Sequence, residues 1–91
     1  MTKELEIINR YILEGRVREA ILQLEAMVGR GDTCDETYFM LGKAYAKMGD
    51  WRRATYNYNA AIELNPDSPA AEALTQIKEI MDFYNTDLYN P

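Results

Sequence analysis

Apolar residues recur every three or four positions along nearly the whole chain, as in Leu5, Ile8 and Ile12. This spacing places them on one face of an α-helix, and no stretch alternates apolar and polar residues for long enough to indicate a strand. Turn-favouring residues interrupt the pattern at Gly15, residues 29–31, Gly49 and residues 65–69. The pattern therefore predicts an all-α fold of five helices joined by short turns.

Capping residues mark three of the expected helix starts. Residues 33–36 have the form of a capping box, in which the threonine hydroxyl and the glutamate carboxylate each satisfy a free backbone N–H. Asp50 is the expected N-cap of the fourth helix, which Pro66 ends. A serine followed by a proline at positions 68–69 predicts the start of the fifth helix, which should run to about Tyr84.

The sequence also repeats itself. Shifting the chain by 34 residues aligns five identical pairs, where ordinary composition gives roughly two. The pairs are Tyr11/Tyr45, Gly15/Gly49, Arg18/Arg52, Ala20/Ala54 and Ala26/Ala60. Residues 35–68 then form one complete helical hairpin, and residues 1–34 form a more divergent copy of it.

The second of these units resembles the tetratricopeptide repeat, whose 34-residue pattern is W-x2-L-G-x2-Y…A-x3-F…P. It matches, exactly or by class, at Tyr38, Leu41, Gly42, Tyr45, Ala54, Tyr58 and Pro66. Gly42 and Ala54 lack bulk, so the two helices of the unit should cross closely there. The resemblance implies a right-handed superhelix of two repeats in a single domain over residues 1–91.

The other parts of the chain depart from the repeat pattern. The first unit has unexpected residues at four pattern positions, which are Glu4, Ile8, Met27 and Asp32. Its helices should therefore pack further apart, or cross at a different angle, than those of the second unit. Residues 69–91 resemble the capping helix, followed by a tail, that covers the last apolar face of such arrays.

In this family the first helix of each unit lines a concave groove that binds a peptide or a protein segment. The resemblance implies that function here, as a protein-interaction module or adaptor. Carried over position by position, the groove residues include Asn9, Ile12, Phe39, Met40, Lys43, Lys47 and Ile77.

Two of these groove residues, Lys43 and Lys47, are four positions apart and so leave one helix on the same side. They could receive an acidic side chain or a terminal carboxylate of a partner. The alternative is that they pair with Glu36, Glu72 or Glu79 of the same chain, or are solvated.

The composition excludes several kinds of chemistry. The chain has no histidine and a single cysteine, Cys34, so a Ser-His-Asp triad, a Cys-His pair and a structural Cys/His zinc site are excluded. No pair of carboxylates is visibly placed in a shared pocket, and no candidate base has a pKa near neutrality. We therefore expect no enzymatic activity, no cofactor and no metal.

The net charge of −5 is unevenly distributed. Acidic and basic residues cancel over residues 1–60, whereas residues 61–91 hold six acidic residues against Lys78 alone. This excess would repel nucleic acid and anionic lipid, so neither is an expected partner. No window approaches the length of an apolar membrane span, and the N-terminus lacks the features of a signal peptide, so we expect a cytoplasmic protein.

Self-association is the alternative function. The chain holds only two and a half repeats, fewer than the three that independent stability usually needs. Exposed end helices could pair two chains as a weak homodimer that needs no foreign ligand. The apolar tail, which includes Leu88 and Tyr89, could fold back over the fifth helix, enter a groove or act as a flexible ligand. We expect it to fold back, because a local contact costs little ordering entropy.

Overall fold

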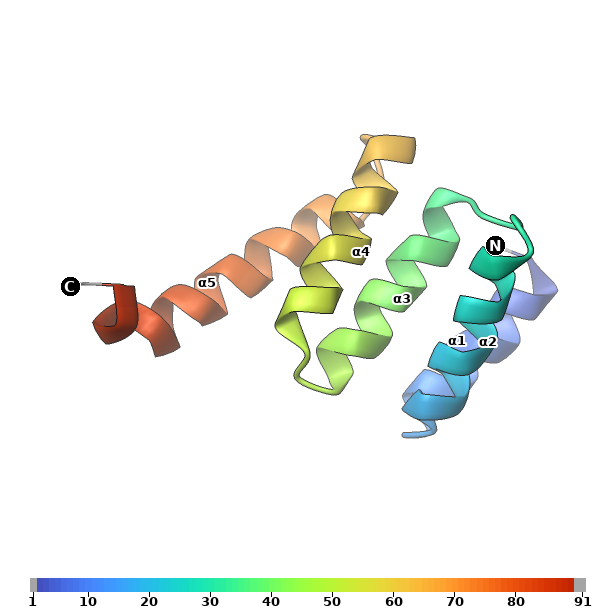
Figure 1. Cartoon of the computed structure of the whole chain (residues 1–91), viewed down its shortest axis with the longest axis horizontal. Coiled ribbons are helices and arrows are strands. Elements are labelled where there is room, and N and C mark those ends of the chain that lie inside the picture. Colours follow the sequence, from blue (N-terminus) through green and yellow to red (C-terminus); the bar gives the residue numbers. More distant parts are fainter. Residues whose placement is uncertain (1, 90–91) are drawn as a thin grey trace.

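A computed structural model describes the backbone of residues 2–89 and the side chains of residues 2–82. This part of the chain forms five helices and no strand: α1 (Lys3–Leu13), α2 (Val17–Gly29), α3 (Asp35–Lys47), α4 (Trp51–Leu64) and α5 (Ala70–Tyr89). The helices follow one another across the molecule, with α1 behind α2, and the C-terminal half of α5 extends beyond α4 (Figure 1). The predicted all-α fold of five helices is confirmed.

The 34-residue repeat is visible in the turns within the two hairpins. Gly15 and Gly49 both adopt the left-handed conformation, with φ values of 87° and 80°. The residue after each glycine donates its backbone N–H to the carbonyl of Tyr11 or Tyr45, over 2.8 and 2.9 Å. The same hydrogen-bonded turn therefore ends α1 and α3, and glycine supplies a conformation that side chains disfavour.

The expected caps of the last two helices are present. Asp50 accepts a hydrogen bond from the backbone N–H of Arg53 over 3.2 Å at the start of α4. The Ser68 hydroxyl accepts one from the backbone N–H of Ala70 over 3.1 Å at the start of α5. These bonds satisfy N–H groups that have no partner within the first turn of a helix.

The predicted capping box at the start of α3 is wrong. The N-cap of α3 is Cys34, which makes no side-chain capping bond. Thr33 lies one position before the N-cap, and a capping hydroxyl must come from the N-cap itself to reach the N–H groups of the first turn. The Cys34 thiol instead lies 3.4 Å from the hydroxyl of Thr37.

Buried apolar side chains form two clusters that together run the length of the array. The cluster among α1, α2 and α3 contains Leu5, Ile8, Ile12, Ala20, Leu24, Met27, Met40, Leu41 and Ala44. The cluster between α4 and α5 contains Ala54, Tyr58, Ala61, Ala70, Leu74 and Ile77. Tyr38 and Tyr45 pack against both clusters and so connect them.

Helices α3 and α4 pack tightly at the buried Gly42. A Cβ atom added there would lie 2.9 Å from Cγ of Tyr58 and closer still to two other ring carbons. The side chain that requires a glycine is therefore Tyr58, which lies one turn after Ala54 on α4. The first hairpin carries Ile8 and Met27 at its small-residue positions, and α1 and α2 contact each other less extensively than α3 and α4.

Helix α5 is longer than the sequence predicted, because it continues past Tyr84 to Tyr89. The predicted contacts of Leu88 and Tyr89 fall on side chains that lie outside the described residues. Over the residues that were searched, none of the helices combines the length and the apolar character needed to cross a membrane.

Candidate functional site

Three of the predicted groove residues lie in the core and present almost no surface. Ile12 and Met40 belong to the cluster among α1, α2 and α3, with 1% and 0% of their surface exposed. Ile77 belongs to the cluster between α4 and α5 and is 4% exposed. The expectation that these three side chains line an open groove is corrected, because they fill the junctions between neighbouring helices.

The structure brings three other predicted groove residues together. The Lys43 ammonium on α3 donates a 3.0 Å hydrogen bond to Oδ1 of Asn9 on α1. The same ammonium lies 5.7 Å from the centre of the Phe39 ring. Asn9 and Lys43 are 34 residues apart and occupy equivalent positions in the two repeats. The pair therefore joins the two groove-lining helices directly.

The lysines do not form the ion pairs considered as the alternative with α5. Lys43 is half-buried and bonds to the neutral side chain of Asn9 rather than to Glu72 or Glu79. Lys47 is exposed one turn further along α3. Among the described residues no ion pair engages either ammonium.

A hollow of about 360 Å³ adjoins Phe39. Its lining comes from the start of α3 and the turn between α4 and α5, and consists of Asp35, Glu36, Phe39, Asn65, Ser68 and Pro69. The Asn65 amide donates a 3.2 Å hydrogen bond to Oδ2 of Asp35, which holds the turn against α3. The Phe39 ring also packs against Tyr58, with 5.9 Å between ring centres.

Glu36 and Phe39 of this lining are at groove positions that the family resemblance implies, whereas the local sequence pattern marks residues 65–69 only as helix termination and capping, and Asp35 as the first turn of a helix. The pairing of Asp35 with Asn65 joins positions 30 residues apart, and no local pattern signals it. We call the surface formed by Asn9, Asp35, Glu36, Phe39, Lys43, Lys47 and Pro69 the concave groove.

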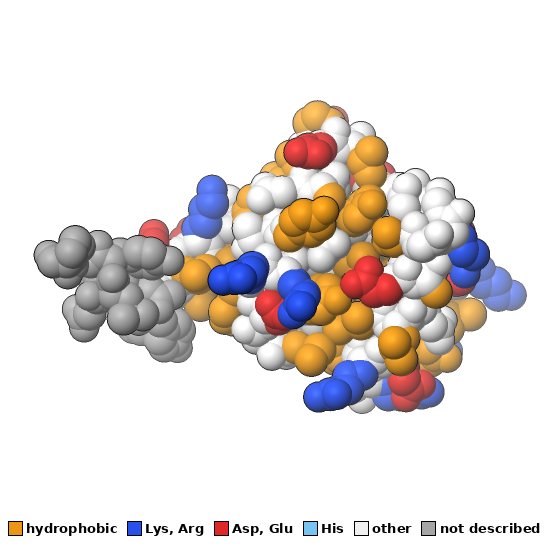
Figure 2. Space-filling view, in the orientation of Figure 1, with side chains coloured by type: hydrophobic (Ala, Val, Ile, Leu, Met, Phe, Trp, Pro, Cys, Tyr) orange, Lys and Arg blue, Asp and Glu red, His pale blue; other side chains and the backbone are white. Residues whose placement is uncertain are grey.

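A second hollow lies on the opposite face, between α2, the end of α3 and α4. It measures about 570 Å³ and is lined by Arg18, Ile21, Leu22, Glu25, Tyr45, Met48, Asp50 and Arg53. Leu22 is 72% exposed and Met48 is 47% exposed. On the face that Figure 2 presents, hydrophobic side chains are exposed between charged ones over the middle of the molecule.

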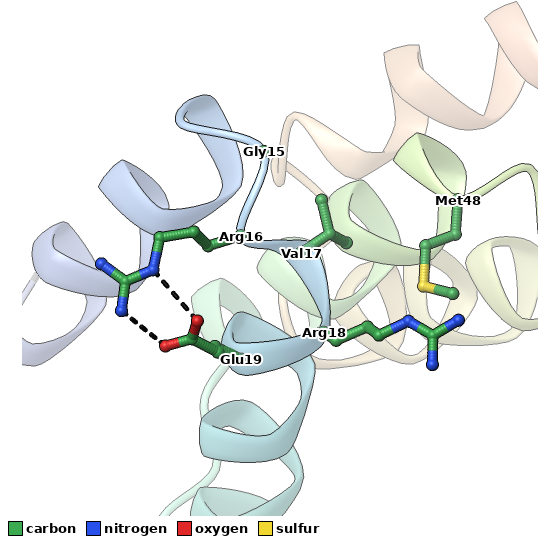
Figure 3. Close-up of a pocket in the computed structure, with 6 residues that line it drawn as sticks. All are labelled: Gly15, Arg16, Val17, Arg18, Glu19 and Met48. Carbon is green, nitrogen blue, oxygen red and sulfur yellow. Dashed lines mark hydrogen bonds and ion pairs between the residues drawn. The ribbon is translucent and has the colours of Figure 1, made fainter.

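A smaller hollow of about 340 Å³ continues this surface to the turn between α1 and α2. It shares Arg18 and Met48 with the larger one. In Figure 3 the Arg16 side chain bends to Glu19, whereas Arg18 extends on the side of Met48. The bond between Arg16 and Glu19 measures 2.6 Å, and it lowers the pKa of the Glu19 carboxyl.

Polar groups on this second face are largely engaged with one another. The Tyr45 hydroxyl donates a 2.8 Å hydrogen bond to Glu25, and burial, followed by this bond, raises the pKa of Tyr45. Arg53 forms a 2.7 Å ion pair with Asp50 and lowers the pKa of that carboxyl through the same contact. On this face the Tyr45–Glu25 bond joins the two repeats, whereas the Arg53–Asp50 pair is local to the start of α4.

Comparison with known proteins agrees with the hairpin geometry. The tetratricopeptide repeat family matches residues 35–68, which are the hairpin of α3 and α4 with its following turn. The solution NMR structure of a Bacteroides fragilis protein is 42% identical to this chain, with a TM-score of 0.84. The similarity covers 98% of this chain and 91% of that one. Among curated proteins, none matches the chain.

Proposed function

Because this chain belongs to the tetratricopeptide repeat family, we propose that it is a non-catalytic interaction module that binds a peptide or protein segment in its concave groove. Members of the family generally bind proteins and are generally not enzymes. The proposal assigns the contacts with the partner to Asn9, Phe39, Lys43 and Lys47.

The observation that carries the proposal is the position of the Lys43 ammonium. It lies beside the half-buried Phe39 ring, and one of its three N–H donors is used by Asn9. The remaining donors can bind a carboxylate or a carbonyl oxygen of a partner. The exposed part of the ring beside them offers an apolar contact, which is the usual combination in a specific binding site.

Affinity capture with the full chain tests the proposal. Proteins retained from a lysate of the source organism are compared between the wild type and the double variant Phe39→Ala/Lys43→Glu. Partners bound in the groove are expected to be lost with the double variant. They should be retained by Leu22→Ser, an equally surface-directed change on the opposite face, and circular dichroism must show that both variants are folded.

Capture that is equal for the wild type and the folded double variant would contradict binding in this groove. Loss of the same partners with Leu22→Ser would instead assign them to the opposite face. The two variants therefore separate the groove from the second hollow.

Self-association is the second candidate function, and the surface of α5 favours it. Ile80 is 38% exposed, and the C-terminal half of the helix extends beyond α4 (Figure 1). Sedimentation over a range of concentrations separates the two functions. A strict monomer at high concentration would remove self-association, and a tight dimer that covers the groove would remove peptide binding.

A further inference from the structure

Opposite the concave groove lies a second surface, which we propose is a docking site for an amphipathic helix with one acidic residue on its apolar face. This second face is formed by residues around the two adjoining hollows: Val17, Arg18, Ile21, Leu22, Tyr45 and Met48. The proposal stands apart from the proposed function, because the second face and the concave groove have no residue in common.

Large apolar side chains are exposed on the second face. Leu22 and Met48 both line the larger hollow and are among the exposed apolar residues of the chain. Val17 and Ile21 are partly exposed and extend the apolar surface. Covering apolar surface is favourable, and a methionine side chain adapts its shape to its neighbours. An apolar partner would therefore gain affinity here.

The position of the two hollows sets the spacing of the partner's apolar side chains. The hollows adjoin each other, since Arg18 and Met48 line both. Residues 15–19 line the smaller hollow, and the larger one is lined by residues of α2 between positions 18 and 25. The hollows are therefore displaced along α2 by about one helical turn, which rises about 5.4 Å. Side chains at positions i and i+4 of a partner helix have a similar displacement, so one can enter each hollow.

The charge between the hollows favours an acidic residue in the partner. Two arginines near this face are already paired, Arg16 with Glu19 and Arg53 with Asp50. Over the residues that the structure describes, no ion pair engages the Arg18 guanidinium, which extends away from the Arg16 pair in Figure 3. A carboxylate placed between the two apolar side chains of the partner would reach Arg18.

The start of α2 adds to the preference for a carboxylate. Its N-cap, Arg16, makes no side-chain capping bond, so the N–H groups of the first turn beside the smaller hollow favour a negative group. The carboxylate of Glu25 lies at the other end of the larger hollow and accepts the Tyr45 hydroxyl. The acidic residue of the partner is therefore directed to the Arg18 end of the second face.

A helix suits this surface better than an extended segment. The larger hollow is lined mainly by residues within α2, α3 and α4, whose backbone groups bond inside their own helices. The side chains of Tyr45 and Glu25 bond to each other, so they offer an extended backbone few partners. A helix satisfies its own backbone groups and presents only side chains to the second face.

Three dye-labelled peptides in a helix-forming background of alanine and glutamine test the proposal on the full chain. The first carries a leucine at position i, a glutamate at i+3 and a leucine at i+4, which share one helix face. The second has the same composition, but its glutamate is moved to i+5, away from that face. The third has a lysine in place of the glutamate at i+3. Fluorescence anisotropy measures the affinity, and amide NMR shifts locate the binding site.

The first peptide is expected to bind about two- to fivefold more tightly than the second, which is the range that an exposed ion pair supplies. The third should bind more weakly than either. Amide signals of Leu22 and Met48 should shift on binding, whereas those of Asn9 and Lys43 should not. Equal binding of the first two peptides would overturn the proposal.

Charge reversal should change the preference in a defined direction. Arg18→Glu should make the peptide with lysine the best ligand. Arg52→Glu is the matched control, because Arg52 is exposed at the equivalent position of the second repeat and is not among the residues that line either hollow. This control should leave the order of affinities unchanged, and Leu22→Ser should weaken the binding of all three peptides.

Arg18→Gln serves as a milder variant if charge reversal disturbs folding, and it should remove the difference between the first two peptides. An order of affinities that stays the same in folded Arg18 variants would contradict the proposal. Shifts confined to the concave groove, or no binding of any peptide, would also overturn it. The proposed function would still stand, because capture by the Phe39→Ala/Lys43→Glu variant tests it separately.

A second copy of the chain is the alternative occupant of the second face. Dilution of the protein without peptide tests this alternative. Signals of Leu22 and Met48 that move with protein concentration would assign the face to self-association and overturn the proposal. Signals that stay constant would leave the face open to the partner helix, as expected.

Discussion

The ring of Tyr58 lies directly against Gly42, where α4 crosses α3. No Cβ atom fits between the two, because it would lie 2.9 Å or less from three ring carbons. The contact brings the backbone of α3 against a large apolar side chain in the middle of the repeat that matches the family. It also positions the Phe39 ring, which packs on the same tyrosine.

Gly42→Ala should destabilise the protein despite the higher helix propensity of alanine. The added methyl group forces Tyr58 or the helix backbone to move, and overpacking of this kind costs about 1–3 kcal/mol. Thermal unfolding followed by circular dichroism should show a decrease in Tm of roughly 5–15 °C.

Gly29→Ala is the control, because an added Cβ at Gly29 meets nothing within 4 Å and its backbone is not in the left-handed region. Its Tm should stay the same or increase slightly. A Gly42→Ala protein that is as stable as this control would contradict the close crossing.

Burial of Tyr58 predicts a loss of stability at alkaline pH. Burial raises the pKa of Tyr58 to about 12, from an ordinary value of 10.0. Between pH 10 and pH 12 the unfolded state releases the proton of the Tyr58 hydroxyl more readily than the folded state does. The stability that the neutral hydroxyl contributes is therefore complete below pH 10 and is lost as the pH approaches 12.

Urea unfolding at pH 8 and pH 11.5 measures this effect. Between these two pH values the free energy of unfolding of the wild type should fall by about 2 kcal/mol more than that of Tyr58→Phe, since phenylalanine keeps the ring but cannot ionise. Equal losses would show that the hydroxyl of Tyr58 is accessible in the folded protein.

The sequence could predict the helices because their signals are local. Apolar spacing marks the buried faces, and Gly15 and Gly49 mark turns that need a left-handed residue. The start of α3 was predicted at nearly the right place for the wrong reason, because a capping box depends on which residue becomes the N-cap. A shift of one position, from Thr33 to Cys34, removes the side-chain bond.

The groove was less predictable, because it depends on angles between helices. Ile12 and Met40 occupy family groove positions, yet here they are buried where the first three helices meet. Their exposure is set by the spacing of neighbouring helices, which no single helix encodes. Asn9 and Lys43 were predicted as groove residues, but their mutual hydrogen bond depends on the distance between α1 and α3.

Removing the cap of α4 should lower stability in a pH-dependent way. Asp50 accepts a hydrogen bond from the Arg53 backbone and pairs with the Arg53 guanidinium, so Asp50→Ala should lower the Tm by about 3–8 °C at pH 7. The interaction with Arg53 lowers the pKa of the Asp50 carboxyl below its ordinary 3.8. The stabilisation from its charge is therefore present above that value and is lost as the pH falls through the lowered pKa.

Differential scanning calorimetry at pH 7 and at about pH 2.5 tests the role of Asp50. The difference in Tm between the wild type and Asp50→Ala should shrink at the lower pH. Asp50→Asn keeps an oxygen that can cap the helix and should recover part of the stability at pH 7. A difference that does not depend on pH would mean that the carboxylate charge contributes nothing to the cap.

The hydrogen bond between Tyr45 and Glu25 offers a probe of the contact between the repeats, because it joins α3 to α2. Burial raises the pKa of Tyr45 first, and the bond to Glu25 raises it further. Glu25→Ala should therefore lower the pKa of Tyr45 while leaving it above its ordinary value, since the ring stays packed. NMR titration of protein with labelled tyrosine measures the change, with Glu63→Ala as an exposed carboxylate control on α4. A Tyr45 pKa that is the same in both variants would show that the two repeats are not joined by this bond in solution.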